Sequence, residues 1–222
     1  MSSHSNETVS VLNGGRSGIK RRLFGHQTGA VSALIRNSPG RGQAESNSLP
    51  LHKTYRSTRY NMRKIKNPWV GKEGYNCFGC SPNNPLGVKM EFYEDGKEIV
   101  SFWRPQADYQ GWIDTMHGGI LSTLIDEAAG WVVFRKLQTS GMTTKLEVKY
   151  KKAVATNEPQ LTIRGRLLCQ NRKFADVEVT IENAKGEICC EGKATYYVFD
   201  RAKAEEMGFT SCELEGDEML PM

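Results

Sequence analysis

Residues 110–130 read QGWIDTMHGGILSTLIDEAAG, and this stretch decides the fold. It contains the triplet His117-Gly118-Gly119, which opens a long apolar segment, and Asp126 follows nine residues after the histidine. Glycines at the start of a helix leave backbone N–H groups uncovered, so that these groups can face an oxygen atom. An acid about two turns further along is a candidate base for the same reactive carbon. A carbonyl-polarising amide and a base are the groups that acyl-group hydrolysis requires.

The apolar segment has helical spacing over residues 118–137. At about 100° per residue, one broad face collects Ile120, Leu121, Leu124, Ile125, Ala128, Trp131 and Val132. The opposite face holds small residues around Asp126, with no Lys or Arg before Arg135. A helix that is apolar on most sides has to be wrapped by other elements. Asp126 and Glu127 in mid-segment argue against a membrane span.

Strand patterns flank this helix on both sides. Before it, residues 88–93 and 99–103 alternate apolar and polar around a turn at Asp95-Gly96, which is typical of a β-hairpin. After it come four further strand-like segments, at residues 146–150, 161–167, 177–181 and 194–199. Short connections imply antiparallel neighbours. The sequence therefore predicts an α+β fold in which an antiparallel β-sheet is wrapped around one long central α-helix.

That layout, together with the His-Gly-Gly motif and its acid, resembles the hotdog fold. More narrowly, it resembles the PaaI-like acyl-CoA thioesterases, over about residues 75–199. The opening Cys77-Phe-Gly-Cys80, followed by Asn-Asn and Leu-Gly, is similar to a subgroup of that family. A bare His-Gly-Gly is a weak signal, but the motif with Asp126 on an apolar helix between a hairpin and four strands is a fairly specific combination.

The resemblance implies roles for five residues. Asp126 corresponds to the acid that activates water or attacks the thioester carbon. Gly118 corresponds to the glycine whose N–H binds the thioester oxygen, and Gly119 is a neighbour that could share this role. His117 is the motif histidine. Thr143 corresponds to a hydroxyl residue that helps to hold the water in some members, offered by the partner subunit.

Substrate-binding residues are implied less directly. Some members carry Asn six residues before the motif histidine, where this chain has Gly111, and the adjacent Gln110 is a candidate substitute. Lys149, Lys151 and Lys152 at the end of a strand are a candidate site for the phosphates of coenzyme A. A plain solvated strand face is the competing interpretation of these lysines.

Simpler alternatives stand beside these assignments. Without the motif, Asp126 would be a buried acid paired to structure, and His117 would be a packed or capping histidine. Glu127 is the second candidate base, and it should point about 100° away from Asp126, so that the two should not face one pocket. Trp112 and Trp131 are expected in the core or in the lining of an acyl tunnel.

The six cysteines favour free thiols. Cys77 and Cys80 form a Cys-x-x-Cys pair, but a structural zinc would need a second pair of matching spacing, and the chain has none. With no secretory signal visible, a disulfide framework is not expected either. The expectation is therefore no metal, and no cofactor other than the coenzyme A of the substrate.

Charge divides the 222-residue chain unevenly. Residues 1–61 hold nine Lys/Arg against two Asp/Glu, a net charge of +7, and the remainder carries −2. This head is expected to be a disordered basic arm, a transit peptide or an upstream extension before a true start at Met62. A hotdog domain is expected over 62–200 and a polar to acidic tail over 201–222. The expected location is cytoplasmic, or mitochondrial if the head is a transit peptide.

The resemblance thus implies a hydrolase that splits an acyl-CoA thioester, acting as a homodimer or a dimer of dimers with the site between subunits. A hotdog module that binds acyl-CoA without turnover is the alternative. A hotdog hydratase or dehydratase is disfavoured, because no second well-placed His is present. Nucleic-acid binding by the basic head is also disfavoured, because it lacks interleaved aromatic residues. The acyl chain cannot be read from the pattern.

Overall fold

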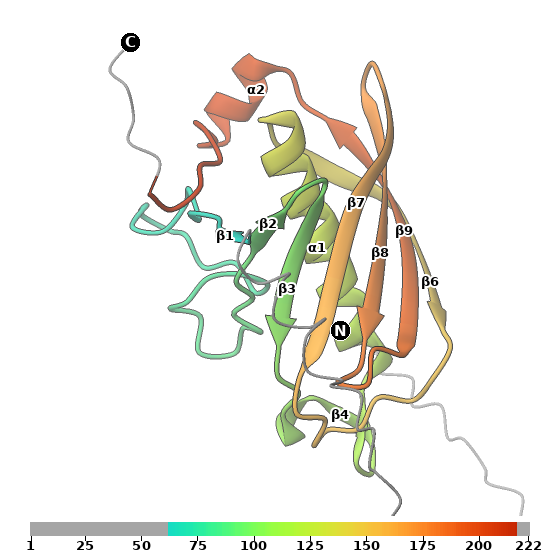
Figure 1. Cartoon of the computed structure of the whole chain (residues 1–222). Helices are drawn as coiled ribbons and strands as arrows, with labels where there is room; N and C mark the ends of the chain where they lie inside the picture. The colour runs from blue at the N-terminus through green and yellow to red at the C-terminus, as the bar shows by residue number, and fades with distance from the viewer. Residues whose placement is uncertain (1–61, 217–222) are drawn as a thin grey trace, which may run out of the picture. The chain divides into compact units, whose positions relative to one another are not determined.

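The computed structural model describes residues 62–216, and Figure 1 shows how their helices and strands are arranged. The expectations for residues 1–61 and 217–222 lie outside the described residues. The strands are β1 (Arg63–Lys64), β2 (Tyr93–Asp95), β3 (Glu98–Trp103), β4 (Gln110–Trp112), β5 (Thr115–Met116), β6 (Gly141–Tyr150), β7 (Leu161–Asn171), β8 (Phe174–Glu182) and β9 (Ile188–Val198). The helices are α1 (Gly118–Leu137), α2 (Arg201–Glu206) and a 3₁₀ turn at Ala107–Tyr109.

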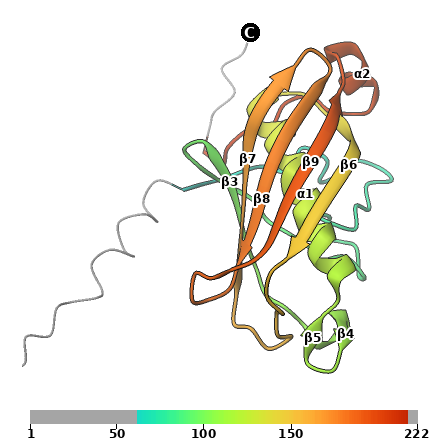
Figure 2. The same cartoon turned by 90° about the vertical axis from the view of Figure 1, so that its right-hand side faces the viewer.

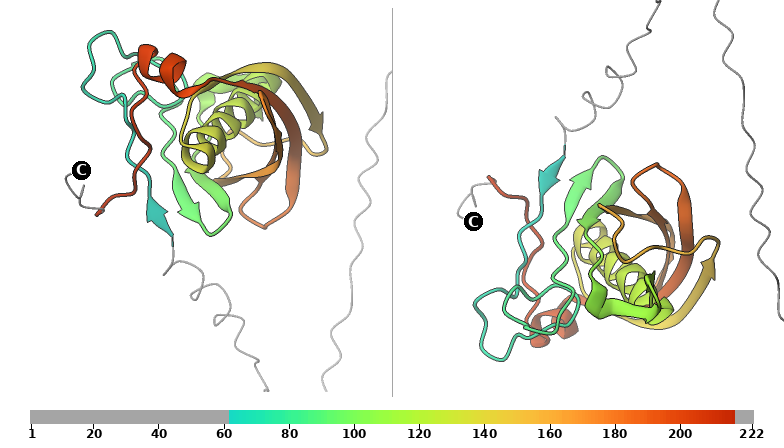
Figure 3. Two further views of the ribbon diagram at one scale, coloured as in Figure 1. Left: turned by 90° about the horizontal axis from the view of Figure 1, so that it is seen from above. Right: turned by 90° about the horizontal axis from the view of Figure 1, so that it is seen from below.

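Seven strands form one antiparallel sheet in the order β1-β2-β3-β7-β8-β9-β6, and β4 and β5 form a separate small ribbon. The strand that follows α1 therefore lies at the far edge of the sheet, beside β9 (Figure 2). Figure 3 shows the sheet curling around α1, which contacts β3, β6, β7, β8 and β9. The expected α+β arrangement, a hotdog fold, is confirmed.

The helix is buried because the sheet closes on it from several sides. Leu124, Ile125 and Trp131 are almost completely inaccessible to solvent. Close approach depends on Gly192 in β9, where an added Cβ would lie 2.3 Å from Cγ2 of Ile125. No side chain fits between helix and sheet at this point, so the glycine sets how closely α1 packs. No helix within residues 62–216 is both long enough and apolar enough to cross a membrane.

The first strand of the predicted hairpin differs from expectation. Residues 88–92 are not in a strand, although Val88, Met90 and Phe92 are buried as their alternation predicts. Their backbone pairs with the cysteine turn instead: Val88 N donates to Phe78 O and Met90 N to Gly79 O, both at 2.8 Å. The alternation was real, but it reflected one buried face rather than membership of the sheet.

The tail also differs from expectation up to residue 216. After α2, the side chains of Phe209, Cys212 and Leu214 are buried in the core, and Leu214 forms a β-bridge with Ile65. Because most residues around them are polar, the average composition of this segment gave no sign that these three apolar side chains are buried. The tail is therefore part of the folded domain as far as the structure describes it.

Candidate active site

The helix start presents one unengaged amide. His117 is the N-cap of α1, and its Nδ1 accepts a hydrogen bond from Gly119 N at 2.9 Å. The Gly119 amide is therefore already hydrogen-bonded. It was expected to share with Gly118 the binding of the thioester oxygen, and this geometry does not support that expectation. Within residues 62–216, no group accepts a hydrogen bond from Gly118 N–H. This amide points out of the positive end of a 20-residue helix dipole, where an anionic oxygen is stabilised.

Tyr150, at the end of β6, closes over this helix tip. Its hydroxyl donates to Gly118 O at 2.9 Å, and Ser122 Oγ lies 2.6 Å from the same hydroxyl. A cavity of about 290 Å³ adjoins the tip, and Lys151 and Lys152 also line it. Lys152 forms an ion pair with Glu187 at 2.6 Å. A lysine and a free amide therefore border one cavity.

Asp126 lies further along α1 and borders another cavity, of about 390 Å³. Thr143 Oγ1 donates to Asp126 Oδ1 at 2.8 Å, and Tyr196 OH donates to the main-chain oxygen of Asp126 at 2.8 Å. The resemblance implied that Thr143 is offered by a partner subunit. In this structure Thr143 of the same chain makes the contact with Asp126.

A β-bulge aims Thr143 at the helix. Thr143 pairs with Tyr196 and Lys145 pairs with Thr195, so Thr144 is left without a partner in the ladder. Strict alternation would place Thr143 on the face opposite Leu146. The extra residue reverses the alternation and turns the hydroxyl toward Asp126.

The amide and the carboxylate do not meet within one chain. Asp126 follows Gly118 by eight residues, which is about 12 Å along a helix axis. The two residues line different cavities. A single chain therefore does not bring the amide and the carboxylate to one carbon, because they lie about 12 Å apart along α1 and border different cavities.

Glu127 shares the cavity of Asp126, contrary to expectation. The cavity reaches around the helix from Asp126 to the loop that carries Cys77 and Cys80, so two residues 100° apart both border it. Burial, assisted by the neighbouring Cys77, raises the pKa of the Glu127 carboxyl to about 7. Trp131 Nε1 donates to Glu127 Oε1 at 3.0 Å.

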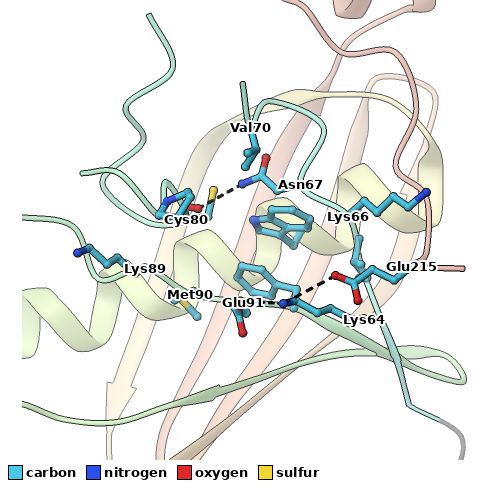
Figure 4. Close-up of a pocket in the computed structure, with 13 residues that line it drawn as sticks. Lys64, Lys66, Asn67, Val70, Cys80, Lys89, Met90, Glu91 and Glu215 are labelled. Atoms are coloured by element: carbon cyan, nitrogen blue, oxygen red, sulfur yellow. Dashed lines mark hydrogen bonds and ion pairs between the residues drawn. The ribbon is translucent and has the colours of Figure 1, made fainter. Parts of the chain in front are cut away.

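Cys77 and Cys80 also border this cavity. The hydrogen bond between the two thiols lowers the pKa of Cys77 to about 5 and raises the pKa of Cys80. Cys80 in addition borders a cavity of about 420 Å³ on which neither Gly118 nor Asp126 lies (Figure 4). In that cavity Lys64 is paired with Glu91 and Glu215, so its charge is already balanced.

Two expected substrate-binding residues lie apart from these groups. Lys149 borders a different cavity of about 260 Å³, together with Glu191 and Lys193. Gln110 is exposed in β4 and pairs with Met116, the residue before the motif. The structure thus brings Thr143 into contact with Asp126, and it places Lys152 at the cavity that Gly118 borders.

Three residues near these cavities were missed or undervalued by sequence reasoning. Tyr150 and Tyr196 appeared only as alternating strand residues, and nothing in their spacing signals a contact with α1. Glu127 was only a second choice for the base. Its neighbours in space, Cys77 and Cys80, lie about 50 residues earlier, and no local pattern connects them.

Comparison with known proteins is consistent with this fold. Residues 114–190, which include Gly118, Asp126 and Thr143, match the thioesterase superfamily. No curated protein matches the chain.

Three solved structures illustrate the likeness. The chain is similar to a thioesterase superfamily protein, with 22% identity and a TM-score of 0.50, over 53% of this chain and 58% of that one. It is similar to a hypothetical thioesterase protein from Streptococcus pneumoniae, solved with coenzyme A (29% identity, TM-score 0.44, 46% of this chain and 81% of that one). It is also similar to thioesterase superfamily member 2 from zebra fish (21%, 0.48, 54% and 88%). The chain thus spans just over half the length of the first of them.

Proposed function

We propose that this protein is a thioesterase that hydrolyses an acyl-CoA to a free acid and coenzyme A, at a site completed by two copies of the chain. The observation that carries the proposal is the pair of groups on α1. One is the unengaged Gly118 amide at the helix tip, and the other is Asp126, oriented by Thr143 in a cavity. The match of residues 114–190 to the thioesterase superfamily supports this assignment.

The edge strand β6 supports the two-copy site. This ten-residue strand pairs only with β9 among the described residues, so its other edge is open to a second sheet. Its first residues lie at the Asp126 cavity, and its last residue lies at the Gly118 cavity. Antiparallel pairing of two β6 edges about a two-fold axis brings the Asp126 end of one copy beside the Gly118 end of its partner.

In this site the thioester carbonyl oxygen accepts a hydrogen bond from Gly118 N–H. Asp126 of the other copy takes a proton from water, and the water oxygen bonds to the carbonyl carbon. The oxygen becomes anionic in the tetrahedral intermediate, where the amide and the helix dipole stabilise it by about 3 kcal/mol. The C–S bond then breaks, and the thiolate leaves with the proton that Asp126 held. Direct attack by Asp126 to form an anhydride is the other route open to the same groups.

Further residues have supporting roles in this proposal. His117 holds the Gly119 amide and so fixes the first turn around Gly118. Lys152 borders the Gly118 cavity together with Lys151, and it would meet a phosphate of coenzyme A by exchanging its ion pair with Glu187. Lys149 lines a different cavity, so for this lysine we keep the interpretation that it belongs to a solvated strand face.

Gly118→Pro tests the role of the amide. Proline lacks the N–H but is well accepted at the first helical position, and the backbone of His117 (φ −67°, ψ 131°) suits a residue that precedes proline. We expect kcat to fall about 100- to 1000-fold against a panel of acyl-CoAs, measured by thiol release. Gly118→Ala is the matched control, since it keeps the N–H and its Cβ would lie 3.4 Å from the Tyr150 ring.

Asp126→Asn completes this test, because it removes the base and keeps the shape. We expect thioester hydrolysis to be lost while the melting temperature stays close to that of wild type. Unchanged rates in both Gly118→Pro and Asp126→Asn would rule out the mechanism.

A binding module without turnover is the second candidate. The separation of about 12 Å between Gly118 and Asp126 favours it if the chain acts as a monomer. Saturable acyl-CoA binding by a monomeric protein, with no thiol release from any acyl-CoA, would identify this function.

A further inference from the structure

We propose that Cys77, Cys80 and Glu127 form a site for a divalent thiophilic cation, with Zn²⁺ as the best fit. One ligand atom from each residue lies within 4.8 Å of the other two. Cys77 Sγ lies 3.7 Å from Glu127 Oε2 and 3.9 Å from Oε1. This inference does not depend on the proposed thioesterase activity.

These distances suit tetrahedral coordination. With Zn–S of about 2.3 Å and Zn–O of about 2.0–2.2 Å, the ligand atoms of a tetrahedral site are about 3.6–3.8 Å apart. The separation between Cys77 Sγ and Glu127 Oε2 already has this value. The site therefore needs only a small contraction to hold the ion. Two thiolates select a soft or borderline cation over Mg²⁺ or Ca²⁺.

Cys77 and Glu127 each accept a hydrogen bond from a group outside the cluster. Gly79 N donates to Cys77 Sγ at 3.3 Å, and Trp131 Nε1 donates to Glu127 Oε1 at 3.0 Å. These donors leave lone pairs free on the sulfur and on the carboxylate. Outer hydrogen bonds of this kind fix the ligands of metal sites.

Cys80 lies at the end of a short chain of hydrogen bonds. Asn67 Nδ2 donates to Tyr75 OH at 2.7 Å, and the Tyr75 hydroxyl lies 3.0 Å from Cys80 Sγ, where either atom can donate. The same Asn67 nitrogen donates to Cys80 O at 3.2 Å and so holds the turn, as Figure 4 shows. Tyr75 OH can donate to the sulfur of Cys80 when that sulfur is a metal-bound thiolate.

No basic side chain balances this cluster. Among residues 62–216, no Lys, Arg or His forms an ion pair with Glu127 or acts on its carboxyl at short range. Two thiols and a largely buried carboxyl are therefore gathered without a positive partner. Buried charges are normally paired or bind a metal, and a divalent cation supplies the missing charge.

Gly79 shows that the backbone makes room for the carboxylate. A Cβ at this position would lie 2.1 Å from Glu127 Oε2, so only glycine lets the carboxylate rest on the Cys-Phe-Gly-Cys turn. The turn is held from behind by the backbone bonds of Val88 and Met90. The three ligands are preorganised by a rigid loop on one side and a helix on the other.

The fourth coordination position faces a cavity. Cys77, Cys80 and Glu127 all border the space of about 390 Å³ that also contains Asp126. A bound ion would therefore keep one position for water or an exogenous ligand, unlike a closed structural site with four protein ligands.

Cobalt titration of the full-length protein tests the site. The protein is reduced, stripped with a chelator and titrated anaerobically with Co²⁺, and then with Zn²⁺ as competitor. We expect one equivalent of Co²⁺ to bind with a sulfur-to-cobalt charge-transfer band and the visible bands of tetrahedral cobalt, and Zn²⁺ to displace it. Cys77→Ser and Glu127→Gln should each weaken binding at least tenfold. Cys169→Ser, at an exposed thiol that also lies near a carboxylate, should leave it unchanged.

Gly79→Ala is the most discriminating variant, because it keeps all three ligands and only displaces the Glu127 carboxylate. We expect weaker cobalt binding with a cooperative thermal transition retained. If Gly79→Ala does not fold, Glu127→Gln replaces it as the test variant, because it removes the carboxylate and preserves the shape of the side chain. No cobalt uptake by the reduced wild-type protein, or uptake that survives both Cys77→Ser and Glu127→Gln, would overturn the proposal.

Discussion

The shortest hydrogen bond to the Asp126 carboxylate comes from Thr143 Oγ1 to its Oδ1 at 2.8 Å, and Tyr196 OH lies 3.4 Å from the same oxygen. Thr143→Val removes the hydroxyl and keeps the shape. Because hydrogen bonds to charged groups are worth about 1.5–3 kcal/mol, we expect kcat to fall roughly 10- to 100-fold with little change in KM. Thr143→Ser should restore most of the loss. Thr144→Val, at the neighbouring hydroxyl that bonds Thr195 O instead, should leave kcat unchanged, and an equal loss there would contradict the assignment.

At the level of single residues, the sequence could predict which residues of the motif matter, but not what they contact. His117, Gly118 and Asp126 were identifiable from one short stretch. The contact of Thr143 with Asp126 was not, because the bulge at Thr144 reverses the alternation on which a strand prediction relies. The approach of Glu127 to the cysteine turn was equally invisible, since spatial proximity across about 50 residues leaves no local signal.

Strand β2 and the last turn of helix α1 are joined by a contact between charged side chains. Glu94 accepts hydrogen bonds from Arg135 Nη2 at 2.8 Å and from Lys136 Nζ. Burial acts to raise the pKa of Glu94, but the hydrogen bonds from Arg135 and Lys136 outweigh it and the pKa is lowered. The ionised carboxylate therefore stabilises the fold above the pKa of the unfolded chain, and this contribution is lost as pH falls through the folded pKa.

Glu94→Gln should consequently destabilise the protein by about 2 kcal/mol near pH 7. The difference in unfolding free energy from wild type should begin to shrink as pH falls below about 4.3, the ordinary pKa of a Glu carboxyl in the unfolded chain. It should vanish only below the lower pKa of the folded state, where the carboxyl is protonated in both states. Denaturant titrations at several pH values measure this. Glu91→Gln, at the more exposed partner of Lys64, should cost less than about 1 kcal/mol. A difference for Glu94→Gln that is independent of pH would contradict the ionic role.

The helix at 118–137 and the existence of the four strands after it were predicted because each buries a regular face against the others. The strand boundaries were less well predicted: β6 begins at Gly141 rather than 146, and β9 begins at Ile188 rather than 194. Residues 88–92 were assigned to a strand incorrectly, since their partner is the cysteine turn rather than β3. Burial with a period of two predicts which side chains face the core, but it does not identify what the backbone pairs with.

At the scale of the whole molecule, Gly118 and Asp126 of one chain border separate cavities. Among residues 62–216 the outer edge of β6 has no partner strand, and it runs between the two cavities. We propose that a second copy pairs along this edge and completes each site. The sequence could suggest a dimer only through its family resemblance. An open strand edge becomes visible only when the order of strands is known, and that order depends on long-range pairing.

Subunit complementation tests this central claim most directly. Gly118→Pro and Asp126→Asn chains are coexpressed with different tags, and thioesterase activity is measured on the mixed population. In a mixed dimer one site contains the intact amide of one chain and the intact carboxylate of the other. Random pairing should therefore restore about a quarter of wild-type activity, although each variant alone is inactive. A mixture no more active than either parent, with mixed dimers present, would contradict the account.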